Sequence, residues 1–131
     1  MKHLLTLLLF ISTSVMAESY LCISDAAGGA RYDEKTKTYK STVFMTGLKY
    51  IFKKEYNYWT FTEIGKEPPN PIYECKKEDK YSLICNMISG QFRFSFDKLR
   101  YSRTSTLGNF LSDDVSSIND VFIEIGACSK I

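Results

Sequence analysis

The chain has 131 residues, of which 44% are hydrophobic and 24% charged, with 17 lysines and arginines against 15 acidic residues. A formal net charge of +2 gives no long-range field that would concentrate nucleic acid or anionic lipid, so we expect no nucleic-acid partner and no charge-driven attachment to a membrane. The length suits one domain that can bury a core.

Residues 1–17 show the order of regions found in a secretory signal peptide. A cationic start at residues 1–3 is followed by an apolar run from Leu4 to Ile11 and a polar stretch that leads to Ala17. The apolar run is shorter than the roughly 20 residues that cross a bilayer, and no later segment is apolar enough to act as a membrane anchor. We expect cleavage near Ala17, one domain at residues 18–131, and a periplasmic or secreted location.

Cleavage would remove His3, the single histidine of the chain. Without histidine there is no Ser-His-Asp triad, Cys-His pair or histidine general base, so we expect a protein that is not an enzyme and uses no cofactor. The remaining acid–base or calcium-binding candidates, Asp113, Asp114 and Asp120, lie in a polar loop, but their spacing is not that of a calcium loop. A solvated acidic loop is the simpler interpretation.

The first half of this domain alternates between short strands and turns, without a helical period. We predict strands at 19–24, 30–33, 38–44, 48–53 and 58–62, with turns at 25–29 and 34–37. Leu48, Tyr50 and Phe52 share one face of the fourth strand, and Trp59 and Phe61 point inward from the fifth. The prolines that follow predict an irregular connection at 66–71.

The four cysteines are Cys22, Cys75, Cys85 and Cys128. In an exported chain they predict two disulfides, for which three pairings exist. We favour Cys75 with Cys85, because these residues flank a charged turn and hairpin geometry would place them opposite each other. Cys22 and Cys128 would then join the two ends of the domain. No metal site is expected, since the domain at residues 18–131 lacks both Cys-x-x-Cys spacing and a histidine to complete one.

Residues 92–101 predict a second hairpin, built from two strands around a two-residue turn. Pairing residue 94 with 101 and residue 92 with 103 places one set of side chains on a common face: Phe92, Phe94, Phe96, Leu99 and Tyr101. The polar stretch 105–120 predicts a long loop, and 121–125 predicts the last strand. About eight to ten strands result, so the expected fold class is all-β, a small antiparallel barrel or sandwich stapled by two disulfides.

Two groups of side chains could form a binding site on such a domain. Arg93, Arg100 and Arg103 suggest a cationic strand face that could bind a carboxylate or phosphate, although ordinary alternation toward solvent also explains them. Aromatic side chains could line a ligand cavity inside a small barrel, although packing of a core is the simpler explanation. These aromatic residues are Tyr50, Tyr58, Trp59, Phe61, Phe94 and Tyr101.

Three segments of the chain carry a resemblance to known exported proteins. Tyr20-Leu21-Cys22, Gly29-Ala30-Arg31-Tyr32-Asp33 and Ile125-Gly126-Ala127-Cys128-Ser129-Lys130-Ile131 resemble elements of a group of short exported proteobacterial proteins, a likeness that covers most of the chain and implies no activity. Gly29-Ala30-Arg31-Tyr32 is also similar to the Ser-Gly-Ala-Arg-Tyr loop of small-barrel periplasmic lysozyme inhibitors, with Gly28 in place of the serine. In that family the loop enters the lysozyme active-site cleft, so the resemblance implies a binding role for Arg31 and Tyr32.

The sequence therefore predicts a non-enzymatic exported β domain whose function is binding; it does not identify the partner, for which a protein or an envelope component is one candidate. Two alternatives stay open. One is a lysozyme inhibitor that acts through residues 29–32. The other is a carrier of a small ligand, which predicts an internal cavity instead of a filled barrel.

Overall fold

The computed structural model describes residues 18–66, 71–72, 74–87, 89–106 and 120–131. Within these ranges every regular element is a β-strand, which confirms the all-β prediction. The strands are β1 (Ser19–Asp33), β2 (Thr38–Val43), β3 (Lys49–Glu55), β4 (Tyr58–Glu63), β5 (Pro71–Ile72), β6 (Cys75–Lys77), β7 (Ser82–Met87), β8 (Gly90–Ser95), β9 (Arg100–Ser105) and β10 (Val121–Lys130). The described residues contain no helix that is long and apolar enough to cross a membrane.

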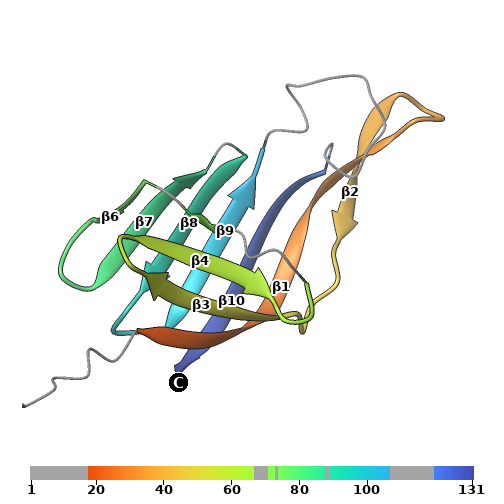
Figure 1. The fold of residues 1–131 in the computed structure, drawn as a ribbon. Coiled ribbons are helices and arrows are strands. Elements are labelled where there is room, and N and C mark those ends of the chain that lie inside the picture. The colour runs from red at the N-terminus through yellow and green to blue at the C-terminus, as the bar shows by residue number, and fades with distance from the viewer. Residues whose placement is uncertain (1–17, 67–70, 73, 88, 107–119) are drawn as a thin grey trace, which may run out of the picture.

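The strands form one antiparallel sheet in the order β5-β4-β3-β1-β10-β9-β8-β7-β6, with β2 added beside β1. The sheet curls until β5 comes into contact with β7, so it makes a nearly closed barrel (Figure 1). Of the two architectures that the sequence left open, the barrel is therefore the one adopted. Curling buries one face of the long strands of the barrel, which is why their side chains alternate between core and solvent, whereas β2 lies off this path and has no buried side chain.

Strand β1 is the longest strand and runs through the segment for which the sequence predicted a turn. That turn at 25–29 is wrong: the chain stays paired with β10 from Tyr20 to Ala30, with one shift of register between Ser24 and Ala26. Gly29 serves close packing of strands instead of a turn, because a Cβ atom there would collide with the carbonyl oxygen of Val121. The first part of β1 pairs with β3 and the last part with β2.

The hairpin of β8 and β9 has the predicted register, with Phe94 opposite Tyr101 and Phe92 opposite Arg103. Its connection is wider than predicted, since the last pair is Ser95 with Arg100 and the residues between them form the turn. Leu99 in this turn has a φ of 51°. The side-chain faces are unaffected, because widening a turn does not change the register of the strands that it joins.

Two strand boundaries differ from the prediction. Pro71 begins the short strand β5 instead of belonging to an irregular connection; because β5 ends the sheet and pairs only with β4, a missing N–H is tolerated there. Strand β10 continues past the predicted end at Ile125 to Lys130. The rest of the predicted connection, residues 67–70, and most of the predicted acidic loop, residues 107–119, lie outside the described residues.

Aromatic rings fill the interior of the barrel. Phe52, Phe92 and Phe94 are at most 1% exposed, and their rings touch, with centroids 5.0 Å apart for Phe52 and Phe92 and 4.9 Å apart for Phe52 and Phe94. Trp59 stacks on Phe52 with centroids 4.5 Å apart. This contiguous packing agrees with the interpretation of the aromatic residues as a core. The hollows that the described residues form lie at the surface and at the ends of the barrel.

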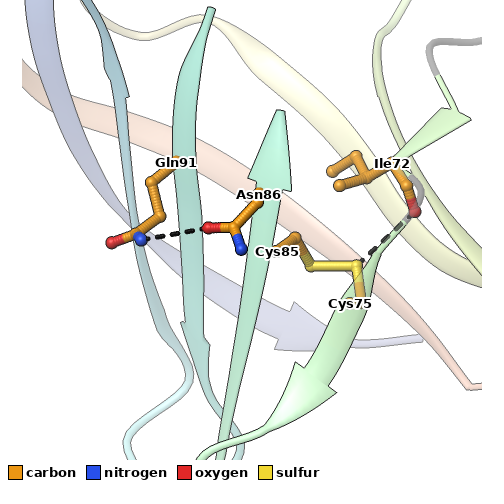
Figure 2. The surroundings of a disulfide bond; sticks show 5 residues. All are labelled: Ile72, Cys75, Cys85, Asn86 and Gln91. Carbon is orange, nitrogen blue, oxygen red and sulfur yellow. Dashed lines mark hydrogen bonds between the residues drawn. A yellow bond between two sulfur atoms is a disulfide. The ribbon is translucent and has the colours of Figure 1, made fainter. Parts of the chain in front are cut away.

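Both predicted disulfides are present, Cys22–Cys128 and Cys75–Cys85, and each joins residues that lie directly opposite on neighbouring strands. No cysteine is left free, a pattern typical of proteins that fold in an oxidising compartment. Figure 2 shows Cys75 beside the carbonyl oxygen of Ile72, which lies 3.5 Å from its Sγ. A disulfide sulfur carries no proton, so this approach is a contact and not a donated hydrogen bond.

Candidate functional site

One end of the barrel opens into a hollow of about 690 Å³, which we call the mouth. It lies where β1 begins and β10 ends, close to the C-terminus (Figure 1). The end of β3, the hairpin of β6 and β7, and the turn after β8 complete its rim. The residues that line the mouth are Glu18, Tyr20, Lys54, Asn57, Trp59, Cys75, Lys76, Lys77, Lys80, Leu83, Phe96, Leu99 and Lys130.

The rim of the mouth is strongly cationic. Its described residues include five lysines and a single acid, Glu18. All five lysines are exposed, and in the described part of the chain none of them forms an ion pair. Lys80 lies over the ring of Tyr81, with its Nζ 4.5 Å from the ring centroid. Like charges gathered on one rim repel one another. Binding of an anion would offset this repulsion.

Strand pairing brings these lysines together from distant parts of the chain. Lys130 at the end of β10 lies opposite Tyr20 on β1. Lys54 near the end of β3 donates its backbone N–H to the carbonyl of Glu18, with N and O 3.0 Å apart. Lys76 and Lys77 lie on β6, which the Cys75–Cys85 disulfide fastens to β7. The cationic rim therefore depends on the register of the sheet and on one disulfide.

The floor of the mouth is aromatic and rigid. Tyr20 and Trp59 are 4% and 6% exposed, and each packs against Phe96, with ring centroids 6.3 Å and 6.0 Å apart. Burial, followed by the negative charge of Glu18, raises the pKa of Tyr20 above its ordinary value, so its hydroxyl is neutral at physiological pH. A ligand in the mouth would meet flexible cations at the rim and fixed apolar rings below them.

The mouth was not among the sites predicted from the sequence. Lys76, Lys77 and Lys80 were assigned only to a turn, while Lys54 and Lys130 belong to strands that are far away in sequence. The small net charge also concealed a local concentration of one sign. The available signal was the presence of three lysines, together with Glu78 and Asp79, inside a hairpin closed by Cys75 and Cys85.

A second polar cluster lies inside the barrel and corrects the prediction for Arg103. The predicted cationic face of Arg93, Arg100 and Arg103 does not form, because the pairing of Arg103 with Phe92 turns its side chain inward. Arg93 stays outside, where it bonds Gln91 at 3.0 Å and approaches Glu78 at 3.5 Å.

Arg103 belongs to a buried network centred on Glu124, which is 2% exposed. The Glu124 carboxylate accepts hydrogen bonds from the Tyr101 hydroxyl at 2.9 Å, the Tyr50 hydroxyl at 3.1 Å and Arg103 Nε at 2.9 Å. The Arg103 guanidinium also lies 5.1 Å from the Tyr50 ring centroid and 5.2 Å from that of Phe122. Burial is the main cause that raises the pKa values of both tyrosines, so they stay neutral. With its oxygens engaged, this carboxylate ties β3, β9 and β10 together.

Arg31 and Tyr32, the predicted binding residues, lie in a strand and not in a loop. Both belong to the part of β1 that pairs with β2. Arg31 binds the carboxylate of Asp120 through Nε at 3.0 Å and Nη2 at 2.9 Å, and the Tyr32 ring packs against Tyr39 at 5.3 Å. These contacts do not favour a loop that inserts into lysozyme, and that interpretation stays a prediction.

The predicted acidic cluster is represented in the structure by Asp120 alone, since Asp113 and Asp114 lie outside the described residues. In the part of the chain that the structure describes, no three His, Cys, Asp or Glu side chains come together as a metal site. No protein-family model, curated protein or solved structure matches the chain.

Proposed function

We propose that this protein is an exported, non-enzymatic binding protein that holds a polyanionic ligand in the cationic mouth. The observation that carries the proposal is the gathering of five lysines, against one acid, around an aromatic floor at one end of the barrel. The signal-peptide pattern of residues 1–17 and the two disulfides support a location outside the cytoplasm.

The strength of a single exposed ion pair argues for a ligand with several charges. Such a pair contributes about 0.2–1 kcal/mol, which is far below the roughly 4 kcal/mol that a millimolar dissociation constant requires. A small monovalent anion would therefore not be retained. A polymer or cluster that contacts four or five lysines at once could reach this range, and burial of part of it on Tyr20 and Trp59 would add to it.

The lysine side chains also indicate how the ligand is recognised. Described residues of the mouth include no arginine, the residue that suits planar bidentate contacts with a carboxylate. Lysine ammonium groups act as point charges on flexible stems and can bind tetrahedral phosphate groups in many orientations. Repeated phosphate groups therefore fit the rim better than a single carboxylate does.

Fluorescence of Trp59 can test the proposal, because Trp59 is the only tryptophan of the chain and lines the mouth. Protein purified after export is titrated with inorganic polyphosphate, and calorimetry of the same mixtures reports binding directly. We expect saturable binding with a change in Trp59 emission. Lys76→Gln/Lys77→Gln should raise the dissociation constant for polyphosphate roughly tenfold, because two ion pairs are lost.

Lys35→Gln/Lys37→Gln is the matched control, since it removes two lysines from the turn that joins β1 to β2, away from the mouth. This variant should bind polyphosphate like the unchanged protein. Absence of saturable binding would contradict the proposal, and so would equal weakening by both double variants. Polyglutamate of matched charge serves as the comparison that separates phosphate recognition from general attraction of acids.

A further inference from the structure

The two disulfides differ in how easily a reagent in solution can reach them. Cys22 and Cys85 are 0% exposed and Cys128 is 8% exposed, whereas Cys75 is half-buried and lines the mouth. Cys75 is therefore the most exposed of the four cysteines. A thiol that approaches it through the mouth passes the lysine rim.

The disulfides also differ in what they hold. Cys22–Cys128 joins β1 to β10 within the core cluster, across a sequence separation of 106 residues. Cys75–Cys85 spans a separation of 10 and fastens only β6, a strand of three residues at the end of the sheet. Closing a longer loop restricts the unfolded chain more, so breaking Cys22–Cys128 opposes folding more than breaking Cys75–Cys85.

The charge of the mouth bears directly on the chemistry of this bond. A disulfide is attacked by a thiolate, and the displaced sulfur leaves as a thiolate. Cations near the bond therefore stabilise both the attacking and the leaving anion. Lys76 and Lys77 adjoin Cys75 in sequence and share its hollow. The same lysines would attract a thiol with an additional negative charge and repel one that carries a positive charge.

We propose that Cys75–Cys85 is a thiol–disulfide exchange site that selects anionic thiols. The thiolate of one such molecule attacks Cys75 Sγ beside the Ile72 carbonyl (Figure 2), the disulfide breaks, and Cys85 leaves as a thiolate that takes up a proton. A second thiol then attacks the outer sulfur of the mixed disulfide and releases Cys75 as a thiol. Two small thiols are oxidised to one disulfide while the protein disulfide is reduced to two cysteines.

Exchange at this bond removes the covalent tie of the strand that carries Lys76 and Lys77, and leaves Cys22–Cys128 in the core. Among the described residues, the lysine rim is then held at β6 by its three pairs with β7 and by the hydrogen bond that Glu78 N–H donates to Ser82 O across the hairpin. The inference uses the charge of the mouth but not its proposed occupant, so it stands or fails independently of polyphosphate binding.

Two small thiols of opposite charge and similar size, mercaptoethanesulfonate and cysteamine, test the proposal. Each is incubated with the folded protein at equal thiolate concentration, freed cysteines are alkylated, and the modified peptides are quantified by mass spectrometry over time. We expect cysteines 75 and 85 to be released before cysteines 22 and 128. The anionic thiol should react about tenfold faster at low salt, with the ratio falling toward one at high salt.

Lys76→Gln/Lys77→Gln should reduce the preference for the anionic thiol, and Lys35→Gln/Lys37→Gln should leave it unchanged. Three results would each overturn the proposal: earlier release of Cys22 and Cys128, equal rates with both thiols in the unchanged protein, or a charge preference that survives in Lys76→Gln/Lys77→Gln. Resistance of both disulfides to both thiols would overturn it as well.

Discussion

Arg103 on β9 donates a hydrogen bond from Nε to Oε1 of Glu124 on the neighbouring strand β10, at 2.9 Å inside the barrel. The Glu124 side chain is 3% exposed and that of Arg103 28% exposed, so removal of the arginine would strand a buried carboxylate. An unpaired buried charge is among the most damaging changes that a fold can suffer.

Arg103→Met should therefore lower the free energy of unfolding by about 3–5 kcal/mol. Arg93→Met is the matched control on the adjacent strand, because Arg93 is exposed and lies 3.5 Å from the exposed Glu78. Its loss should be below about 1 kcal/mol. Urea unfolding followed by circular dichroism measures both values. Similar losses for the two variants would mean that the buried network does not hold β9 and β10 together.

From the two buried tyrosines we predict a loss of stability at alkaline pH. Burial, together with the charge of Glu124, raises the pKa values of Tyr50 and Tyr101 above their ordinary value. Below about pH 10 both side chains are neutral whether the chain is folded or not. Above that pH the unfolded chain loses these protons while the folded barrel keeps them, so stability falls as the pH rises.

The expected slope is roughly 1.4 kcal/mol per pH unit for each tyrosine. Unfolding in urea at a series of values from about pH 8 to about pH 11 measures it. The absence of a free cysteine limits disulfide exchange during these experiments. A free energy of unfolding that stays constant over this range would show that Tyr50 and Tyr101 titrate normally in the folded state.

The turn between β3 and β4 contains a backbone strain that a glycine would relieve. Tyr56 is its first residue, with a φ of 50° and 94% of its surface exposed. A positive φ at the first of two turn residues favours glycine, and other residues pay about 1 kcal/mol or more there. Tyr56→Gly should raise the free energy of unfolding by about 1 kcal/mol. Asn57→Gly, at the neighbouring position, should give no such gain in the same thermal and urea experiments.

Binding in the mouth should depend strongly on salt. The lysines of the rim are exposed, and salt screens exposed charges over a Debye length of about 10 Å at 0.1 M. We expect the dissociation constant for polyphosphate to rise on the order of tenfold between low and physiological ionic strength. Calorimetry at several salt concentrations measures the change. A dissociation constant independent of salt would point to binding through the aromatic floor alone.

Local patterns predicted much of the barrel. Alternation of apolar residues identified the inward faces of Tyr50, Phe52, Trp59 and Phe61 correctly, because a strand that borders a core buries every second side chain. The two cysteine pairs were also confirmed, since a hairpin leaves few ways to place Cys75 and Cys85. The inward faces and the Cys75–Cys85 pair depend on residues that are close in sequence. The Cys22–Cys128 pair follows because these are the two cysteines that remain.

The features that were missed depend on pairing between distant segments. Glycines at 28–29 indicate a turn when read locally, but β10 approaches Gly29 so closely that a Cβ atom there would collide with its backbone. Arg103 was assigned to a surface face although its predicted pairing with Phe92 already turned it inward; the buried partner that accounts for a cation there, Glu124, lies on another strand. The rim of the mouth likewise joins Lys54, Lys76 and Lys130 only after the sheet has closed.

The most direct test of the central proposal locates polyphosphate on the folded protein by nuclear magnetic resonance. Amide resonances of isotopically labelled protein, and the indole N–H of Trp59, are followed during a titration. We predict shifts concentrated at Lys54, Lys76, Lys77, Lys130 and Trp59, with the turn at 34–37 unchanged. Shifts centred on the hairpin of β1 and β2 around Arg31, or no shifts at saturating polyphosphate, would contradict an anion-binding mouth.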